Sequence, residues 1–117
     1  MGAVFRQVQD GKMNYWDYVP TARKMIDISD NFCANYLINR LGEGDVEAGF
    51  AYVNDFARSI GCGKTSLNRT MLDEDSDREN YTTAEDCATL LKMLYRYELV
   101  SPQYSSDMLS MLKADRK

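Results

Sequence analysis

The stretch DVEAGFAYVNDFARSIG, residues 45–61, decides the fold class. Its apolar side chains recur every three or four positions, which is the spacing of one face of an α-helix. These residues are Val46, Phe50, Val53, Phe56 and Ile60. Gly61 follows directly, and glycine often ends a helix because it adopts a left-handed conformation without strain. The stretch therefore predicts an amphipathic helix from about residue 45 to residue 60.

Two more helices are predicted before this stretch. Pro20 suits the first turn of a short helix over 21–28, because the N–H that proline lacks has no partner there. The triplet 29–31, Ser-Asp-Asn, interrupts the pattern, since these residue types favour caps and turns. A further helix is predicted over about 32–41, where two nearby glycines end it.

Helical patterns return after a loop of about 20 residues, 62–81, and loops of that length are often functional. Thr82 and Glu85 have the spacing of a capping box, which predicts a helix that runs to about residue 97. The Ser-Pro pair at 101–102 predicts the start of the last helix.

No strand pattern is evident, so the predicted fold is all-α. We expect a single domain of about five helices over residues 20–117, preceded by an N-terminal loop segment, 1–19.

The composition excludes several classes of function. The chain has 117 residues, a net charge of −4 and no histidine. The acidic balance argues against a nucleic-acid partner, whose phosphates require a basic surface. Without histidine, Ser-His-Asp and Cys-His catalysis cannot occur within the chain. No apolar run is long enough to span a membrane.

Metal and cofactor sites are not predicted. The three cysteines are far apart and form no CxxC pair, so a zinc site is not expected. Residues 73–77 resemble the start of a calcium loop, but Arg78 and Ala84 stand where such a loop needs glycine and glutamate. Residues 61–66 resemble the end of a P-loop, but Arg58 replaces its first glycine.

The triplet Ser29, Asp30 and Asn31 has two interpretations. The first is a helix cap. The second is catalytic, because a serine hydroxyl can relay a proton and an asparagine amide can both donate to and accept from a substrate amide. The catalytic interpretation requires both side chains to face a cleft that they share with a nucleophile.

The stretch MIDISDNFCANYLINRLG, residues 25–42, resembles the second active-site motif of class A β-lactamases and their penicillin-binding relatives. In that family an S-D-N loop joins two helices, and the second helix ends in L-G. Further similar segments follow in the same order, at 53–61, 65–69, 80–86 and 99–104. The resemblance covers about residues 20–115. It implies most of the helical lobe of a two-lobed fold, whose active site lies between this lobe and an α/β lobe.

Two of that family's three active-site motifs are missing from their places. The nucleophile motif, S-x-x-K, belongs upstream of Ser29 and is not found there. The third motif, K-T-G or K-S-G, belongs on a downstream strand, but Lys64-Thr65 is followed by Ser66 in a predicted loop. Met71 stands where class A enzymes have the glutamate of deacylation, and a thioether cannot activate water.

The resemblance implies roles for four residues. Ser29 would relay protons to the leaving nitrogen, and Asn31 would contact the motif lysine and the substrate amide. Asp30 would hold the loop through backbone hydrogen bonds. Arg69 would anchor the omega loop through a carboxylate in the stretch 73–77, since such pairs are geometrically specific. Without the resemblance, Ser29 is a cap and Arg69 a surface charge.

The expected function is therefore the isolated helical lobe of a β-lactamase-like serine hydrolase, not catalytic alone. It would contribute the S-D-N side of a site for a β-lactam or a peptidoglycan peptide. The alternative is a diverged helical scaffold or protein-interaction domain, which Met71 favours slightly.

The expected partner is the α/β lobe of the parent protein, and an apolar surface left open would favour self-association. The chain shows no signal peptide. The resemblance implies that the parent is exported to the periplasm or the cell surface.

Overall fold

The structure is a computed structural model that describes residues 1–113. Six helices and no strand are present among these residues, which confirms the all-α class. The end of the predicted domain, 114–117, lies outside the described residues. The helices are α1 (Gly2–Gln9), α2 (Tyr15–Ile28), α3 (Asn31–Leu41), α4 (Val46–Ser59), α5 (Ala84–Tyr95) and α6 (Pro102–Lys113).

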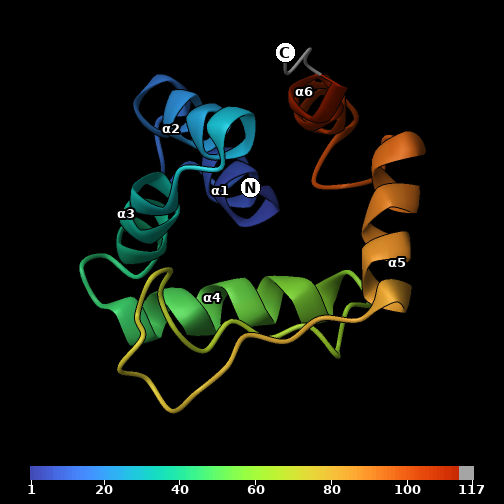
Figure 1. Cartoon of the computed structure of the whole chain (residues 1–117). Coiled ribbons are helices and arrows are strands. Elements are labelled where there is room, and N and C mark those ends of the chain that lie inside the picture. Colours follow the sequence, from blue (N-terminus) through green and yellow to red (C-terminus); the bar gives the residue numbers. More distant parts are fainter. Residues whose placement is uncertain (114–117) are drawn as a thin grey trace.

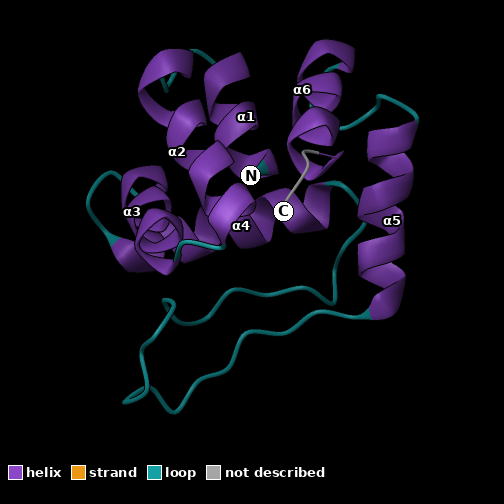
Figure 2. Ribbon diagram, turned by 45° about the horizontal axis from the view of Figure 1, so that its top comes forward, coloured by secondary structure: helices purple, strands orange, loops and turns teal. Residues whose placement is uncertain are grey.

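The outer helices form a ring around α1 (Figure 1). Helix α2 packs on α3, α3 packs on α4, and α6 contacts both α5 and α2. Helix α1 contacts α2, α3 and α4 from the inside of the ring. The long segment between α4 and α5 closes the ring, and part of it extends away from the helices as a loop (Figure 2).

The N-terminal segment 1–19 was predicted as a loop, and that prediction is wrong because α1 and the first turn of α2 lie within it. Helix α1 is short, and Ala3, Val4 and Phe5 are consecutive and all buried. A helix of eight residues makes only about two turns, so its apolar spacing does not repeat often enough to identify it from the sequence. The predicted count of about five helices missed this one.

Helix α2 begins six residues before the predicted start. Asn14 caps it by accepting hydrogen bonds from the backbone N–H groups of Trp16 and Asp17, at 2.9 and 3.3 Å. Pro20 therefore lies inside the helix rather than at its first residue. Because proline has no N–H group, the helix lacks one backbone hydrogen bond to the preceding turn at this position.

Helices α4 and α5 lie close to their predicted bounds. Asp45 caps α4 through hydrogen bonds from the next turn, and Gly61 follows its end with a φ of 88°. The cap of α5 is Thr83 rather than Thr82, because the Thr83 hydroxyl accepts from the backbone N–H of Asp86 at 3.0 Å. The apolar period therefore located α4 and the capping residues located α5, whose cap shifted by one residue and whose end lies two residues before the predicted one.

The contact between α3 and α4 depends on Gly49. A Cβ atom at this position would collide with the backbone carbonyl oxygen of Ile38 on α3. Backbone cannot move aside as a flexible side chain can, so the two helices approach this closely only with glycine here.

We expect Gly49→Ala to lower the free energy of unfolding by about 1–3 kcal/mol, even though alanine favours helices, because the methyl group forces α3 and α4 apart. Chemical denaturation measures the loss. The control is Gly63→Ala, since a Cβ at Gly63 has nothing within 4 Å and should change little. Equal stability of the two variants would contradict the close contact.

Candidate functional site

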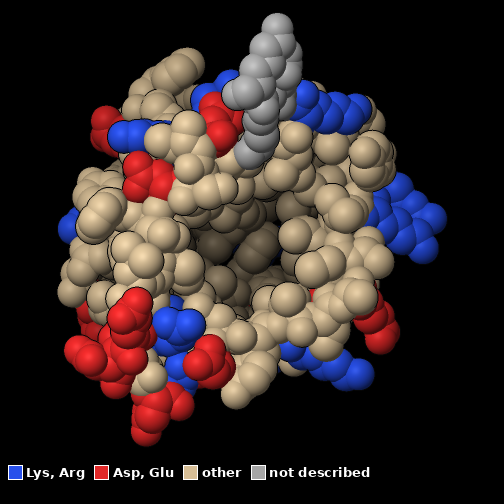
Figure 3. All heavy atoms as spheres, viewed as in Figure 1, with Lys and Arg blue, Asp and Glu red and all other residues tan. Residues whose placement is uncertain are grey.

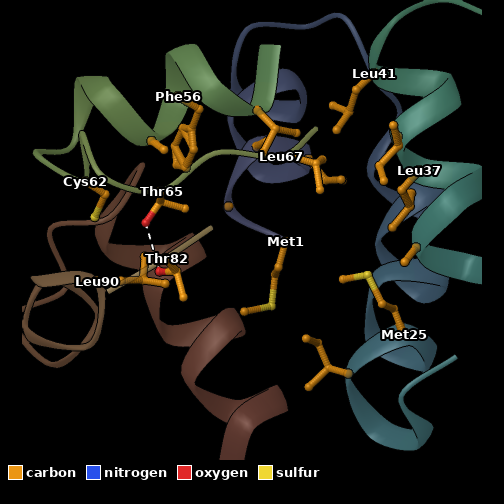
Figure 4. A pocket seen from close by; sticks show the side chains of 18 of the residues that line it. Met1, Met25, Leu37, Leu41, Phe56, Cys62, Thr65, Leu67, Thr82 and Leu90 are labelled. Atoms are coloured by element: carbon orange, nitrogen blue, oxygen red, sulfur yellow. Dashed lines mark hydrogen bonds between the residues drawn. The ribbon is translucent and has the colours of Figure 1, made fainter. Parts of the chain in front are cut away.

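A cavity of about 550 Å³ lies at the centre of the ring and opens on one face of the molecule (Figure 3). Its wall is largely apolar, and Leu37, Leu41, Phe56 and Leu90 project toward it from α3, α4 and α5 (Figure 4). Met1, at the start of α1, also points into it. The cavity is open to solvent on this face, so its apolar wall is accessible to a ligand.

Ser29, Asp30 and Asn31 all line this cavity, at the junction of α2 and α3. Ser29 ends α2 with φ 53° and ψ 44°, a left-handed conformation that is uncommon for serine. Asn31 is the first residue of α3. Both side chains are exposed, and neither makes a hydrogen bond to the described residues, so both hydroxyl and amide are free to meet a ligand.

Asp30 is the N-cap of α3. Its Oδ1 atom accepts hydrogen bonds from the backbone N–H groups of Phe32 and Cys33, at 2.9 and 3.1 Å. Lys24 lies 3.7 Å from its other oxygen. The bond from Cys33, then that from Phe32 and the charge of Lys24, lowers the pKa of the Asp30 carboxyl group below its ordinary value. Asp30 thus fixes the backbone between Ser29 and Asn31.

Two asparagine side chains, which the sequence analysis did not single out, tie the long loop to the helices. Asn35 of α3 accepts from the backbone N–H of Met71 at 2.7 Å and donates to its carbonyl oxygen at 2.9 Å. Asn54 of α4 makes the same pair of bonds with Leu67, at 2.6 and 3.1 Å. Met71 and Leu67 thereby become part of the cavity wall. No local sequence signal identifies these contacts, because their partners are 13 and 36 residues away.

Arg69 lies in the same loop, but its partners differ from the prediction. It donates to the backbone carbonyl oxygen of Asp73 at 3.0 Å and to the carboxylate of Glu79 at 3.4 Å. The prediction of a carboxylate within 73–77 is therefore wrong, since the carboxylate comes from the returning limb of the loop. The Asn80 side chain joins the two limbs further by accepting from the backbone N–H of Arg69 at 3.0 Å.

The base of the loop is fixed by Asp86, a buried residue of α5. Its Oδ2 atom accepts from the backbone N–H of Lys64 at 3.0 Å and from the hydroxyl of Thr65 at 2.7 Å. Thr65 and Thr82 share a hydrogen bond of 3.0 Å beside the cavity (Figure 4). The pair Lys64-Thr65 therefore closes the loop and does not resemble a strand-borne K-T-G motif.

The letters S-x-x-K do occur once, at Ser110–Lys113, so the motif is missing only from its place upstream of Ser29. Ser110 lines a separate surface cleft with Tyr15 and Trp16 and does not reach the central cavity. It also lies in the last turn of α6, where the helix dipole disfavours the negative charge of an activated serine. This tetrapeptide is therefore not the partner of the S-D-N triplet.

Two negative findings concern residues 1–113. No group of three or more His, Cys, Asp or Glu side chains there is placed to hold a metal ion. None of the helices in that range is both long and apolar enough to cross a membrane.

One comparison with known proteins gives a match. The family model described as "Beta-lactamase enzyme family" covers residues 4–117. No curated protein and no solved structure matches the chain.

Replacing Asn35 by alanine should release the loop from α3, because two hydrogen bonds to Met71 are lost together. We expect trypsin to cleave after Arg69 and Arg78 several times faster in Asn35→Ala than in the unmodified protein. Asn39→Ala is the matched control on the same helix, since Asn39 bonds only Gly44. Loop cleavage that is equally fast in both variants would show that Asn35 does not hold the loop.

The lowered pKa of Asp30 predicts a pH dependence of stability. The ionised Asp30 contributes fully to the free energy of unfolding above the unfolded pKa of about 3.9. This contribution is lost as the pH falls through the lower pKa of the folded state. Asp30→Asn retains a good N-cap but does not titrate. Urea midpoints between pH 2 and pH 6 should therefore fall more steeply in the unmodified protein than in Asp30→Asn. Parallel curves would contradict the assigned role of this carboxylate.

Proposed function

The chain belongs to the β-lactamase enzyme family, and we propose that it forms the helical lobe of a β-lactamase-like serine hydrolase. In this proposal the lobe contributes the S-D-N side of a site for a β-lactam or a peptidoglycan peptide. The observation that carries the proposal is the placement of Ser29 and Asn31, with free and exposed side chains, on the rim of the central cavity.

The chemistry of the rim supports these roles. The Ser29 hydroxyl can pass a proton to a leaving nitrogen, and the Asn31 amide can pair with a substrate amide. Asp30 holds the backbone between them by accepting two N–H groups of α3. A site needs this kind of preorganised support to position its reacting groups.

The lobe is not catalytic by itself in this proposal. The only S-x-x-K tetrapeptide lies outside the cavity, and there is no histidine in the chain to serve as a base. Met71 lies on the cavity wall, and Asn35 holds its backbone. By the resemblance to class A enzymes, Met71 stands at the position of their deacylation glutamate. A complete parent protein would therefore be acylated and then release its product slowly.

The missing partner in this proposal is the α/β lobe of the parent protein, which we place outside the cytoplasm. Ile28, Phe32 and Tyr36 flank the S-D-N junction, and their exposed fractions are 64%, 78% and 49%. An apolar patch beside a site edge suits a lobe–lobe contact, and in its absence the same patch favours self-association.

Intact-protein mass spectrometry after incubation with a reactive penicillin tests the proposal on this chain. We expect no added mass, because no nucleophile and base meet in the cavity. The control is a complete penicillin-binding enzyme under the same conditions. A stoichiometric adduct on Ser29 or Ser110 would overturn the assignment of a non-catalytic lobe.

The same test extends to the full-length parent. Ser29→Ala should slow acylation by about 10²-fold, the usual effect of losing a proton relay, and Ser106→Ala, on the exposed side of α6, should not. If Ser29→Ala and Ser106→Ala behave alike, the alternative of a diverged scaffold or interaction domain, which Met71 favours, would replace the proposal.

A further inference from the structure

The surface cleft that contains Ser110 lies between α2 and α6 and has a volume of about 470 Å³. Helix α2 contributes Trp16, Pro20 and Arg23, which recur at the spacing of one helix face. Helix α6 contributes Asp107 and Ser110. None of these five residues lines the central cavity, so the cleft is separate from the S-D-N site.

The indole ring of Trp16 is open to solvent and supported from within the protein. Its exposed fraction is 78%. The ring of Tyr15 meets it at an angle of 72°, with 4.9 Å between the ring centroids. Tyr15 is itself fixed, because its hydroxyl group donates to Oδ2 of Asp107 at 3.2 Å and its ring stacks on that of Tyr104 at 6.2 Å. Trp16 therefore offers a flat aromatic face whose position is set before a ligand arrives.

The two charged side chains of the cleft have opposite signs, and each can bond a ligand. Arg23 forms no ion pair with the described residues. Asp107 accepts from Tyr15 at Oδ2, so its other oxygen can accept from a ligand. Asp107 would repel a phosphate, and Arg23 would repel an ammonium group. A hydroxyl group suits both side chains, because it accepts from a guanidinium and donates to a carboxylate.

The combination of an aromatic face with hydroxyl-binding groups fits a pyranose sugar. The flat face of a pyranose ring carries C–H groups, which pack on an aromatic ring, and its edge carries hydroxyl groups, which bond polar side chains. Arg23 follows Trp16 by seven positions. The two residues are therefore about 10 Å apart along α2, which is about the length of two linked pyranose rings.

We propose that the cleft between α2 and α6 binds a neutral oligosaccharide of pyranose units. One sugar ring stacks on Trp16, and the hydroxyl groups of the oligosaccharide bond Asp107 and Arg23. This inference goes beyond the proposed function, because the cleft uses neither the S-D-N triplet nor the central cavity. Its failure would leave the proposed function untouched.

The fluorescence of Trp16 tests the proposal directly, because Trp16 is the only tryptophan of the chain. The probes are three neutral trisaccharides that differ in linkage and substituents: chitotriose, cellotriose and maltotriose. We expect at least one of them to shift the emission to shorter wavelength in a saturable way, since a stacked sugar ring removes water from the indole. The expected Kd is below about 1 mM. Glycerol, which has hydroxyl groups but no ring, should give no saturable shift.

Substitutions identify the cleft as the place of binding. Arg23→Ala and Asp107→Ala should each raise the Kd about fivefold or more, as expected for the loss of a hydrogen bond to a charged group. The matched controls are Arg40→Ala and Asp17→Ala, since Arg40 and Asp17 are exposed and lie outside the cleft. Their Kd should equal that of the unmodified protein.

Titration calorimetry examines the stacking without relying on fluorescence. Trp16→Ala should abolish most of the binding, whereas Trp16→Phe, which retains an aromatic face, should preserve much of it. The absence of a saturable signal with all three trisaccharides would overturn the proposal. So would binding that Arg23→Ala, Asp107→Ala and Trp16→Ala leave unchanged, because the sugar would then lie elsewhere on the protein.

Discussion

The burial of α1 is the constraint on which the rest of the structure depends. Phe5 is wholly inaccessible to solvent, and its ring lies 5.2 Å from that of Tyr104 on α6 and 6.2 Å from that of Tyr15 on α2. Because α1 occupies the middle, the other helices cannot pack across the centre and instead pack side by side around it. The cavity lies where this central element begins, so the same constraint creates both the core and the hollow.

A ring of short helices requires sharp turns, and these turns place the candidate site. Only Ser29 and Asp30 separate α2 from α3, so the chain must reverse within two residues. Ser29 takes the left-handed conformation and Asp30 caps the next helix. The hydrogen bonds of the Asp30 cap offset the backbone strain at Ser29. The sharp turn makes the junction of α2 and α3 face the cavity. The geometry of the rim is thus a consequence of the ring.

Local signals predicted much of the fold but little of the loop. The apolar period located α3 and α4, since each presents one face to the core, and Gly61 marked the end of α4. The period failed for α1, which is only eight residues long and does not repeat its apolar spacing. The loop depends on Asn35 and Asn54, whose backbone partners are remote in sequence. An asparagine in a helix gives no indication of such a partner, so the loop anchors required the structure.

Part of the candidate site could also be predicted from the sequence, and part could not. Asp30 was predictable as a cap from its residue type, because a short carboxylate before a helix accepts backbone N–H groups wherever the helix lies. The placement of Ser29 and Asn31 on a cavity was not, because the cavity arises from the packing of helices far apart in sequence. Asp30 and Asn35 fix this rim, since their side-chain oxygens accept hydrogen bonds from backbone N–H groups, and the side chains of Ser29 and Asn31 take no part. The rim is therefore held in place before any ligand binds.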